Sequence, residues 1–320
     1  MIDSDINQHT IRQPIHCTGI GVHSGRRVTM RILPAGVDHG IVFHRADIVR
    51  DAAAERARIP ALWDRVSDTR LCSMLANGAG ATVGTVEHIM AALAGCGIDN
   101  ALISLDGPEV PIMDGSAAPF VFLLQCAGII AQEAPRRVIR VLKRVEVQED
   151  DGARVCLEPA ADFSVDMTID FPSAAIAQQR RQHKGYNGAF IDTIAEARTF
   201  GFLHEVEALR AAGLARGGSL DNAIVVAGDR IMNEGGLRYD DEFVRHKILD
   251  AVGDLYLAGA PLLARFTGYR SGHRHNNKVL AALFADATAY RVESAADLAA
   301  APAERADYAA GYRQALARSA

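Results

Sequence analysis

Apolar and polar positions alternate over residues 26–41 and change to a three-to-four-residue repeat near residue 85. Alternation is typical of a half-buried strand, and the longer repeat is typical of an amphipathic helix. Thr85 stands where it could cap the start of that helix. A strand at residues 101–105 follows, and then a second helix at residues 116–124, capped by Ser116. The first part of the chain therefore predicts mixed strands and helices.

The same two patterns recur after a polar break. The run Gln132-Glu-Ala-Pro-Arg-Arg137 contains a proline and three charges, so it predicts a linker between two halves. Beyond it we expect strands at residues 138–147, 154–157, 163–171, 223–227 and 262–269, and helices at residues 202–215, 242–258 and 276–284. The predicted organisation is an N-terminal domain (1–131), a linker (132–137), a C-terminal domain (138–290) and a tail without a readable motif (291–320).

Charge and composition remove several classes of function. The chain has 34 Lys and Arg against 39 Asp and Glu and no block of lysines, so nucleic acid is not an expected partner. Its five cysteines are widely spaced and form no C-x-x-C pair, which favours reduced thiols and a cytoplasmic location. The first ten residues lack the features of a signal peptide, and the most apolar stretch, residues 120–131, is too short for a transmembrane segment. No obligatory protein partner is evident.

The helix at residues 242–258 carries the most informative polar pattern. His246, Asp250 and Asp254 follow one another at i, i+4 steps, and Lys247 lies close to the same stripe, because each residue turns the helix by about 100°. Apolar residues occupy the rest of the circumference, so most of this helix should be buried. One interpretation is a solvated face with charge pairs. The other is a metal site, since imidazole and carboxylate groups one turn apart can bind one Zn²⁺ ion.

Catalytic zinc needs a third protein ligand, and two segments offer histidines. His88 follows Glu87 in the first turns of the helix near residue 85, so one residue could bind metal while the other moves protons. His273 and His275 lie where a strand meets a helix. Glu-His pairs are common on protein surfaces, however, and a loop histidine is often only a polar surface residue. From the residues alone, both interpretations stay open.

Six segments taken together resemble one family, the UDP-3-O-acyl-N-acetylglucosamine deacetylases, which are zinc hydrolases of the committed step in lipid A synthesis. The segments occur in the family's order between about His9 and Phe284 and are Thr85–His88, Gly97–Asn100, Pro111–Phe120, Ala197–Phe202, His246–Asp254 and Ser271–Lys278. The resemblance implies an α+β fold with two similar two-layer α/β domains, whose helices are sandwiched between the two sheets. It places the active site at the domain junction.

The resemblance also implies roles for individual residues. His88, His246 and Asp250 would bind Zn²⁺, leaving one position for water. Glu87 would be the general base and His273 the general acid, or a group that assists it. Asp254 would hold His273 charged and oriented, and Thr199 would donate a hydrogen bond to the oxyanion. Lys247 and His23 would contact the polar head of the substrate. Phe200 would pack against the sugar or the acyl passage.

An insertion at about residues 190–223 would form an apolar passage for the 3-O-acyl chain, with Phe202, Val206 and Leu214 among its walls. Without the resemblance, these residues and Phe200 are equally consistent with core packing. The expected reaction is hydrolysis of the acetamide of UDP-3-O-(3-hydroxyacyl)-N-acetylglucosamine, giving a free amine and acetate. The alternatives are a zinc amidohydrolase acting on another acetamido sugar, and a zinc or sugar-nucleotide binding protein without turnover.

Two residues near the predicted site have other expected roles. His275 is expected to face solvent or to cap its helix, with His273 as the catalytic imidazole. Cys72 could bind an excess or inhibitory metal ion, because a thiol is a soft zinc ligand. It is not expected to be a catalytic ligand. The acyl-chain length and the oligomeric state have no signature in the sequence.

Overall fold

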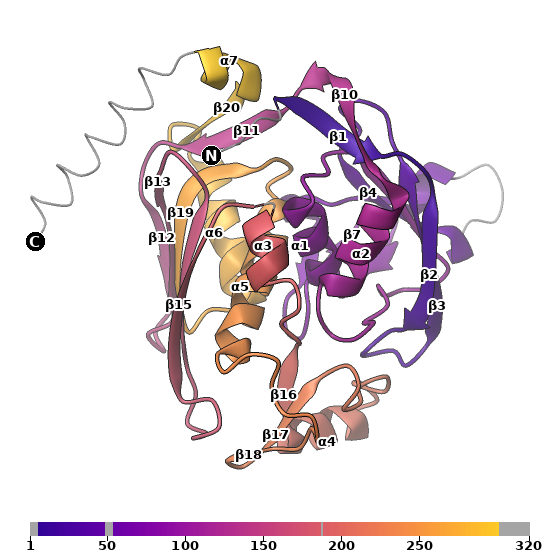
Figure 1. Cartoon of the computed structure of the whole chain (residues 1–320), viewed down its shortest axis with the longest axis vertical. Coiled ribbons are helices and arrows are strands. Elements are labelled where there is room, and N and C mark those ends of the chain that lie inside the picture. The colour runs from indigo at the N-terminus through magenta and orange to yellow at the C-terminus, as the bar shows by residue number, and fades with distance from the viewer. Residues whose placement is uncertain (1–5, 49–53, 187, 301–320) are drawn as a thin grey trace, which may run out of the picture.

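Two sheets enclose a central layer of helices in the computed structural model, which describes residues 6–48, 54–186 and 188–300 (Figure 1). A five-stranded sheet has the order β2-β3-β9-β4-β5, and a seven-stranded sheet has the order β12-β13-β19-β11-β20, with β14 paired to β19 and β15 paired to β14. The predicted α+β class is confirmed. Among the described residues, no helix combines the length and the apolar character that crossing a bilayer requires.

The first sheet is formed by the N-terminal half of the chain. Val28, Met30 and Ile32 alternate with more exposed residues along β3 and are fully buried, so the predicted half-buried strand is confirmed. The strands are β2 (Ile15–Ile20), β3 (Arg27–Pro34), β4 (Ile41–Arg45), β5 (Arg58–Pro60) and β9 (Ala101–Leu105), and the helices are α1 (Glu87–Gly95) and α2 (Ala118–Ala127). Nearby lie β6 (Val66–Asp68), β7 (Met74–Ala76) and β8 (Thr82–Val83), with 3-10 turns η1 (Ala46–Ile48), η2 (Ala54–Ala57) and η3 (Trp63–Arg65).

The second sheet is formed by the C-terminal half. Its strands are β11 (Arg137–Val141), β12 (Val145–Gln148), β13 (Arg154–Pro159), β14 (Ser164–Asp170), β15 (Gln178–Lys184), β19 (Leu262–Tyr269) and β20 (Tyr290–Ser294). The helices of this half are α3 (Gly188–Thr193), α5 (Glu242–Tyr256), α6 (His273–Ala285) and α7 (Ala295–Ala300). A small unit at one end of the molecule contains β16 (Phe200–Phe202), α4 (Leu203–Ala211), β17 (Ile224–Ala227) and β18 (Arg230–Ile231) (Figure 1).

Helices α1 and α5 pack against each other at the centre of the molecule, one from each half (Figure 1). A Cβ atom added at Gly253 would lie 2.0 Å from the backbone oxygen of Glu87, so only glycine allows the two backbones to come this close. All but two residues of α5, Arg245 and Lys247, are buried, which confirms the prediction that this helix buries most of its circumference. The close approach brings the polar residues of both helices into one place.

The predicted linker at residues 132–137 is not an irregular segment. It lies mostly within β10 (Ile129–Pro135), which pairs with β1 (Asn7–Ile11), and ends at the first residue of β11. The proline misled the prediction because Pro135 is the last residue of its strand, where it interrupts little of the ladder. The division into two domains stays a prediction.

The boundaries of several other predicted elements differ from those in the structure, each for a physical reason. The predicted strand at residues 138–147 is two strands, β11 and β12, which are not neighbours in the sheet. β15 was not expected because it is polar throughout, yet its backbone pairs with β14 along its whole length. The predicted tail 291–320 starts too early, since β20 pairs with β11 and α7 buries Ala295 and Leu298. The remainder of that tail, residues 301–320, lies outside the described residues.

Candidate active site

A cavity of about 710 Å³ lies between α1, α5, the start of α6 and the small β16–β18 unit. All of the predicted site residues line this cavity except Asp254, which lies behind His273. The lining residues come from both halves of the chain, as the resemblance implied. The fold therefore brings the predicted site residues together.

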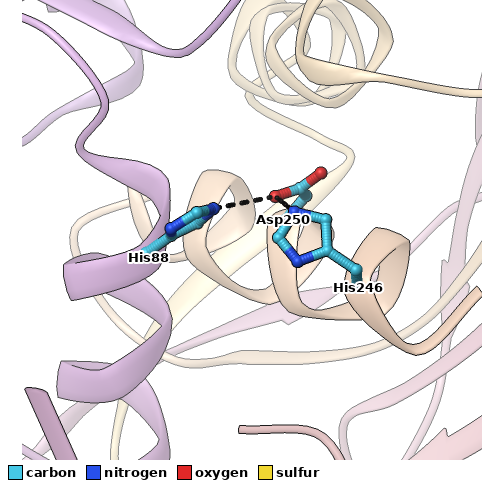
Figure 2. A group of neighbouring side chains, drawn as sticks. All are labelled: His88, His246 and Asp250. Carbon is cyan, nitrogen blue, oxygen red and sulfur yellow. Dashed lines mark ion pairs between the residues drawn. The ribbon is translucent and has the colours of Figure 1, made fainter. Parts of the chain in front are cut away.

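His88, His246 and Asp250 form a group whose ligand atoms all lie within 4.8 Å of one another. Figure 2 shows His88 on α1 facing His246 and Asp250 on α5, with Asp250 Oδ1 lying 3.7 Å from His88 Nε2 and 3.2 Å from His246 Nε2. The three residues are only 2–3% exposed. Two imidazole nitrogens and one carboxylate oxygen converging in a buried place are a donor set that fits a divalent metal ion.

The protonation states also fit a metal ion. His246 Nδ1 donates to the carbonyl oxygen of Ala197 at 3.0 Å, which turns Nε2 toward Asp250. Burial lowers the pKa of His88 to about 3, so its ring is neutral near pH 7. Burial alone would raise the pKa of Asp250, but His246 and Lys247 outweigh it and hold that pKa well below its usual range. Lys247 Nζ bonds to Asp250 Oδ2 at 3.0 Å and leaves Oδ1 to face the histidines.

Glu87 and His273 form an acid–base pair beside this group. His273 Nε2 lies 3.9 Å from Glu87 Oε1, and His273 Nδ1 lies 2.8 Å from Asp254 Oδ2. Burial raises the pKa of Glu87 to about 8. Burial alone would lower the pKa of His273, but the Asp254 carboxylate outweighs it and raises that pKa to about 10. The raised pKa makes the ionised Glu87 carboxylate a stronger base than an ordinary glutamate, while His273 holds a proton ready to donate.

Thr199 and Phe200 line the cavity at the start of β16, in the small unit. The Thr199 N–H donates to Gly115 O, and the Thr199 carbonyl accepts from the N–H of Ile224, each at 2.8 Å, so the backbone at this position is fixed. Phe200 packs edge-on against the rings of Phe243 and His246, with centroids 5.0 and 6.2 Å away. It therefore packs in the core and also faces the cavity.

A buried glutamate supports the loop that carries His23. Glu109 accepts hydrogen bonds from the backbone N–H groups of His23 and Ser24, both at 2.9 Å, and from the hydroxyl of Thr85. Thr85 is therefore not a helix cap as predicted; its φ is 58° and Val86 precedes the helix instead. Glu109 was not predicted because its contacts are mainly with backbone groups and leave no spacing pattern in the sequence.

Two further residues near the cavity, His275 and Cys72, were expected to have roles other than catalysis. His275 Nδ1 accepts the N–H of Gly272 at 3.3 Å, so it caps α6, one of the two expected roles; its burial contradicts the other, exposure to solvent. Burial raises the pKa of the Cys72 thiol, which is therefore protonated near neutral pH. Cys72 does not belong to the described His-His-Asp group.

One wall of the cavity is apolar and comes from the small unit. Phe202 and Val206 line it as predicted, but Leu214 does not, because α4 ends at Ala211 and not at the predicted residue 215. The other apolar residues of this wall are Leu203, Leu209, Ala215, Leu220, Ala223, Val225 and Met232. The wall is adjacent to the polar group of α5, so the cavity has one polar end and one apolar end.

A buried ion pair fixes the segment that orients His246. Arg198 contacts both carboxylate oxygens of Glu242, at 2.9 and 3.0 Å, and Glu242 is fully buried. Ala197, the neighbour of Arg198, supplies the carbonyl that accepts from His246. Because Arg198→Ala leaves a buried carboxylate without its partner, we expect it to lower the free energy of unfolding by about 3–5 kcal/mol.

Urea denaturation measures this loss, and Arg144→Ala is the control. Arg144 pairs with Glu146 and Glu158 at the surface, so its removal should cost at most about 1 kcal/mol. Equal losses in the two variants would show that the buried pair has no special role in stability.

The chain is similar in sequence to one family of enzymes along most of its length. Residues 8–285 match the family model described as UDP-3-O-acyl N-acetylglycosamine deacetylase. A protein of Phenylobacterium zucineum (strain HLK1) is 50% identical over 290 residues, covering 91% of this chain and 97% of the relative. One of Acidithiobacillus ferrooxidans (strain ATCC 53993 / BNL-5-31) is 52% identical over 280 residues, covering 87% and 90%.

A third relative comes from Shewanella frigidimarina (strain NCIMB 400), with 47% identity over 291 residues, covering 90% of this chain and 93% of the relative. All three relatives are named UDP-3-O-acyl-N-acetylglucosamine deacetylase. The family match and the three relatives each span most of the chain, and the family match includes every residue of the cavity discussed above. The chain therefore belongs to the UDP-3-O-acyl N-acetylglycosamine deacetylase family.

Proposed function

We propose that this protein hydrolyses the acetamide of UDP-3-O-(3-hydroxyacyl)-N-acetylglucosamine to a free amine and acetate, the committed step of lipid A synthesis. The observation that carries the proposal is the buried His-His-Asp group beside Glu87 and the His273–Asp254 pair, in a cavity with one apolar wall. The names of the relatives supply the substrate. We also infer a cytoplasmic location from the five cysteines, which are all free thiols.

We infer that the metal ion is Zn²⁺, held by His88 Nε2, His246 Nε2 and Asp250 Oδ1. This set leaves a position open, as in catalytic zinc sites, and it contains no soft thiolate. When bound, the ion would act as a Lewis acid that makes water more acidic and a carbonyl more electrophilic.

The protein's own groups supply the proton transfers. Glu87 takes a proton from the water whose oxygen attacks the acetamide carbonyl. As the C–N bond breaks, His273 gives its proton to the leaving nitrogen, so that acetate and an amine result. Thr199 donates a hydrogen bond to the oxyanion formed by the attack, and Asp254 keeps His273 charged and oriented by its bond to Nδ1.

The remaining residues bind the substrate on either side of the reacting bond. Lys247 and His23 would contact its polar head, and Phe200 its sugar or the start of the acyl chain. The apolar wall would enclose the acyl chain, with burial contributing about 0.8 kcal/mol per methylene. A zinc amidohydrolase for a different acetamido sugar would not need this wall, and a binding protein without turnover would not need both Glu87 and His273.

Acetate release is the deciding experiment. We expect the purified protein to release acetate from the UDP-3-O-acyl substrate, and kcat/KM to rise by about fourfold for each methylene that enters the passage. Leu209→Ala should weaken this preference because Leu209 lines the cavity, while Leu214→Ala, outside it, serves as the matched control. Equal kcat/KM for short and long acyl chains would contradict acyl recognition by this wall. The absence of acetate release would contradict the proposed function as a whole.

A further inference from the structure

Ser73 contacts Glu87 and also Asp254, the carboxylate bonded to His273, although it does not line the cavity. It lies in the loop just before β7 and is only 2% exposed. Its backbone N–H donates to Glu87 Oε2 at 3.0 Å, and its hydroxyl donates to Asp254 Oδ1 at 2.5 Å. One residue from the N-terminal half thus joins a carboxylate on α1 to a carboxylate on α5.

The two oxygens of Asp254 have different partners. His273 Nδ1 and the side-chain amide of Asn276 both bond to Oδ2, at 2.8 and 2.9 Å. The Ser73 hydroxyl bonds to Oδ1. A carboxylate held on one oxygen can still turn about its Cβ–Cγ bond, whereas donors on both oxygens fix its plane. Because hydrogen bonds to an ionised group in a buried place are strong, the Ser73 bond should fix this plane firmly.

The plane of Asp254 decides where His273 points. The ring of His273 is bonded through Nδ1 to Asp254, and its opposite nitrogen faces Glu87 at 3.9 Å. If Asp254 turned, His273 Nε2 would move relative to Glu87, and a displacement of about 1 Å between catalytic groups can cost about a hundredfold in rate. Meanwhile the Ser73 N–H fixes the oxygen of Glu87 that does not face His273.

We propose that Ser73 is a positioning residue that sets the geometry between Glu87 and His273. Its backbone N–H fixes the Glu87 carboxylate, and its hydroxyl fixes Asp254, which in turn orients His273. This inference rests on the proposed function, because it concerns the same proton transfers. Ser73 touches neither the cavity nor the His-His-Asp group, so it should act on the rate of reaction and not on binding of substrate or metal.

Steady-state kinetics of acetate release by the zinc-loaded enzyme test the proposal. Ser73→Ala removes the hydroxyl and keeps the backbone N–H, so we expect kcat to fall by about ten- to a hundredfold, the usual effect of losing a hydrogen bond to a charged group, with KM unchanged within about twofold. Ser73→Thr restores the hydroxyl and should recover most of kcat. Ser173→Ala removes another buried hydroxyl, one that donates to Gly228 O away from the cavity, and should leave kcat unchanged.

Two readouts separate this role from general loss of structure. Ser73→Ala should keep the wild-type metal content, and in the metal-free protein the proton NMR signal of His273 Nδ1–H should shift or broaden, while Ser173→Ala leaves it in place. A wild-type kcat in Ser73→Ala, or a loss of kcat that Ser73→Thr does not reverse, would overturn the proposal. If the wild-type protein itself released no acetate, the proposed function would fail. The NMR test is independent of that result: an unchanged His273 signal in Ser73→Ala would contradict the positioning role of Ser73.

Discussion

Glu87→Gln is expected to lower kcat for acetate release by about 10²- to 10⁴-fold, the usual contribution of a general base. Glutamine keeps the size of the side chain and cannot take a proton from water. Burial raises the pKa of Glu87 to about 8, close to the pH at which such a base is most effective. The metal content should stay that of the wild-type protein, because Glu87 is not a member of the His-His-Asp group.

The measurement combines acetate release with metal analysis of the same samples. Glu207→Gln is the control, since Glu207 is an exposed residue of α4 that does not line the cavity. Full activity of Glu87→Gln would remove Glu87 from the mechanism. Loss of the metal together with activity would instead show that Glu87 helps to hold the ion.

His246→Ala is expected to abolish tight metal binding and, with it, activity. Changes in groups that merely support a ligand already cost about 10- to 100-fold in metal affinity, so removal of a ligand should cost more. The remaining His88 and Asp250 supply two of the three protein ligands that a catalytic zinc site needs. We expect the metal to be lost on dialysis, as measured by elemental analysis.

A thermal shift provides the second readout for this variant. A ligand that binds only the folded state raises its stability, so chelation should lower the melting temperature of the wild-type protein. The melting temperature of His246→Ala should not respond to chelator, while the exposed control His16→Ala should behave like the wild type. Wild-type metal content in His246→Ala would show that the ion binds elsewhere.

The helical spacing of His246, Asp250 and Asp254 was enough to predict one polar stripe on a buried helix, because spacing along a helix is a local property. His88 could not be joined to that stripe by spacing, since the contact between α1 and α5 is a property of the whole fold. The resemblance supplied this link, and the structure brings His88 together with His246 and Asp250.

Other parts of the site had no signal in the sequence. Ser73, the Ala197 carbonyl and Glu109 act through backbone groups or through single hydrogen bonds to distant residues. Such contacts follow from tertiary structure and impose no periodicity on the chain. The same reason explains β15, which joins the sheet through its backbone while its side chains are polar.

The absence of a side chain at Gly253 has a consequence for how mutations at the site should be interpreted. The main-chain oxygen of Glu87 occupies the space that a Cβ atom of residue 253 would fill, so the backbones of α1 and α5 are in direct contact at this point. The side chain of Glu87 takes no part in that packing between the two backbones. A side-chain substitution at position 87 leaves this backbone contact in place, whereas a methyl group added at position 253 would force the two helices apart and separate His88 from His246 and Asp250 without altering any of the three.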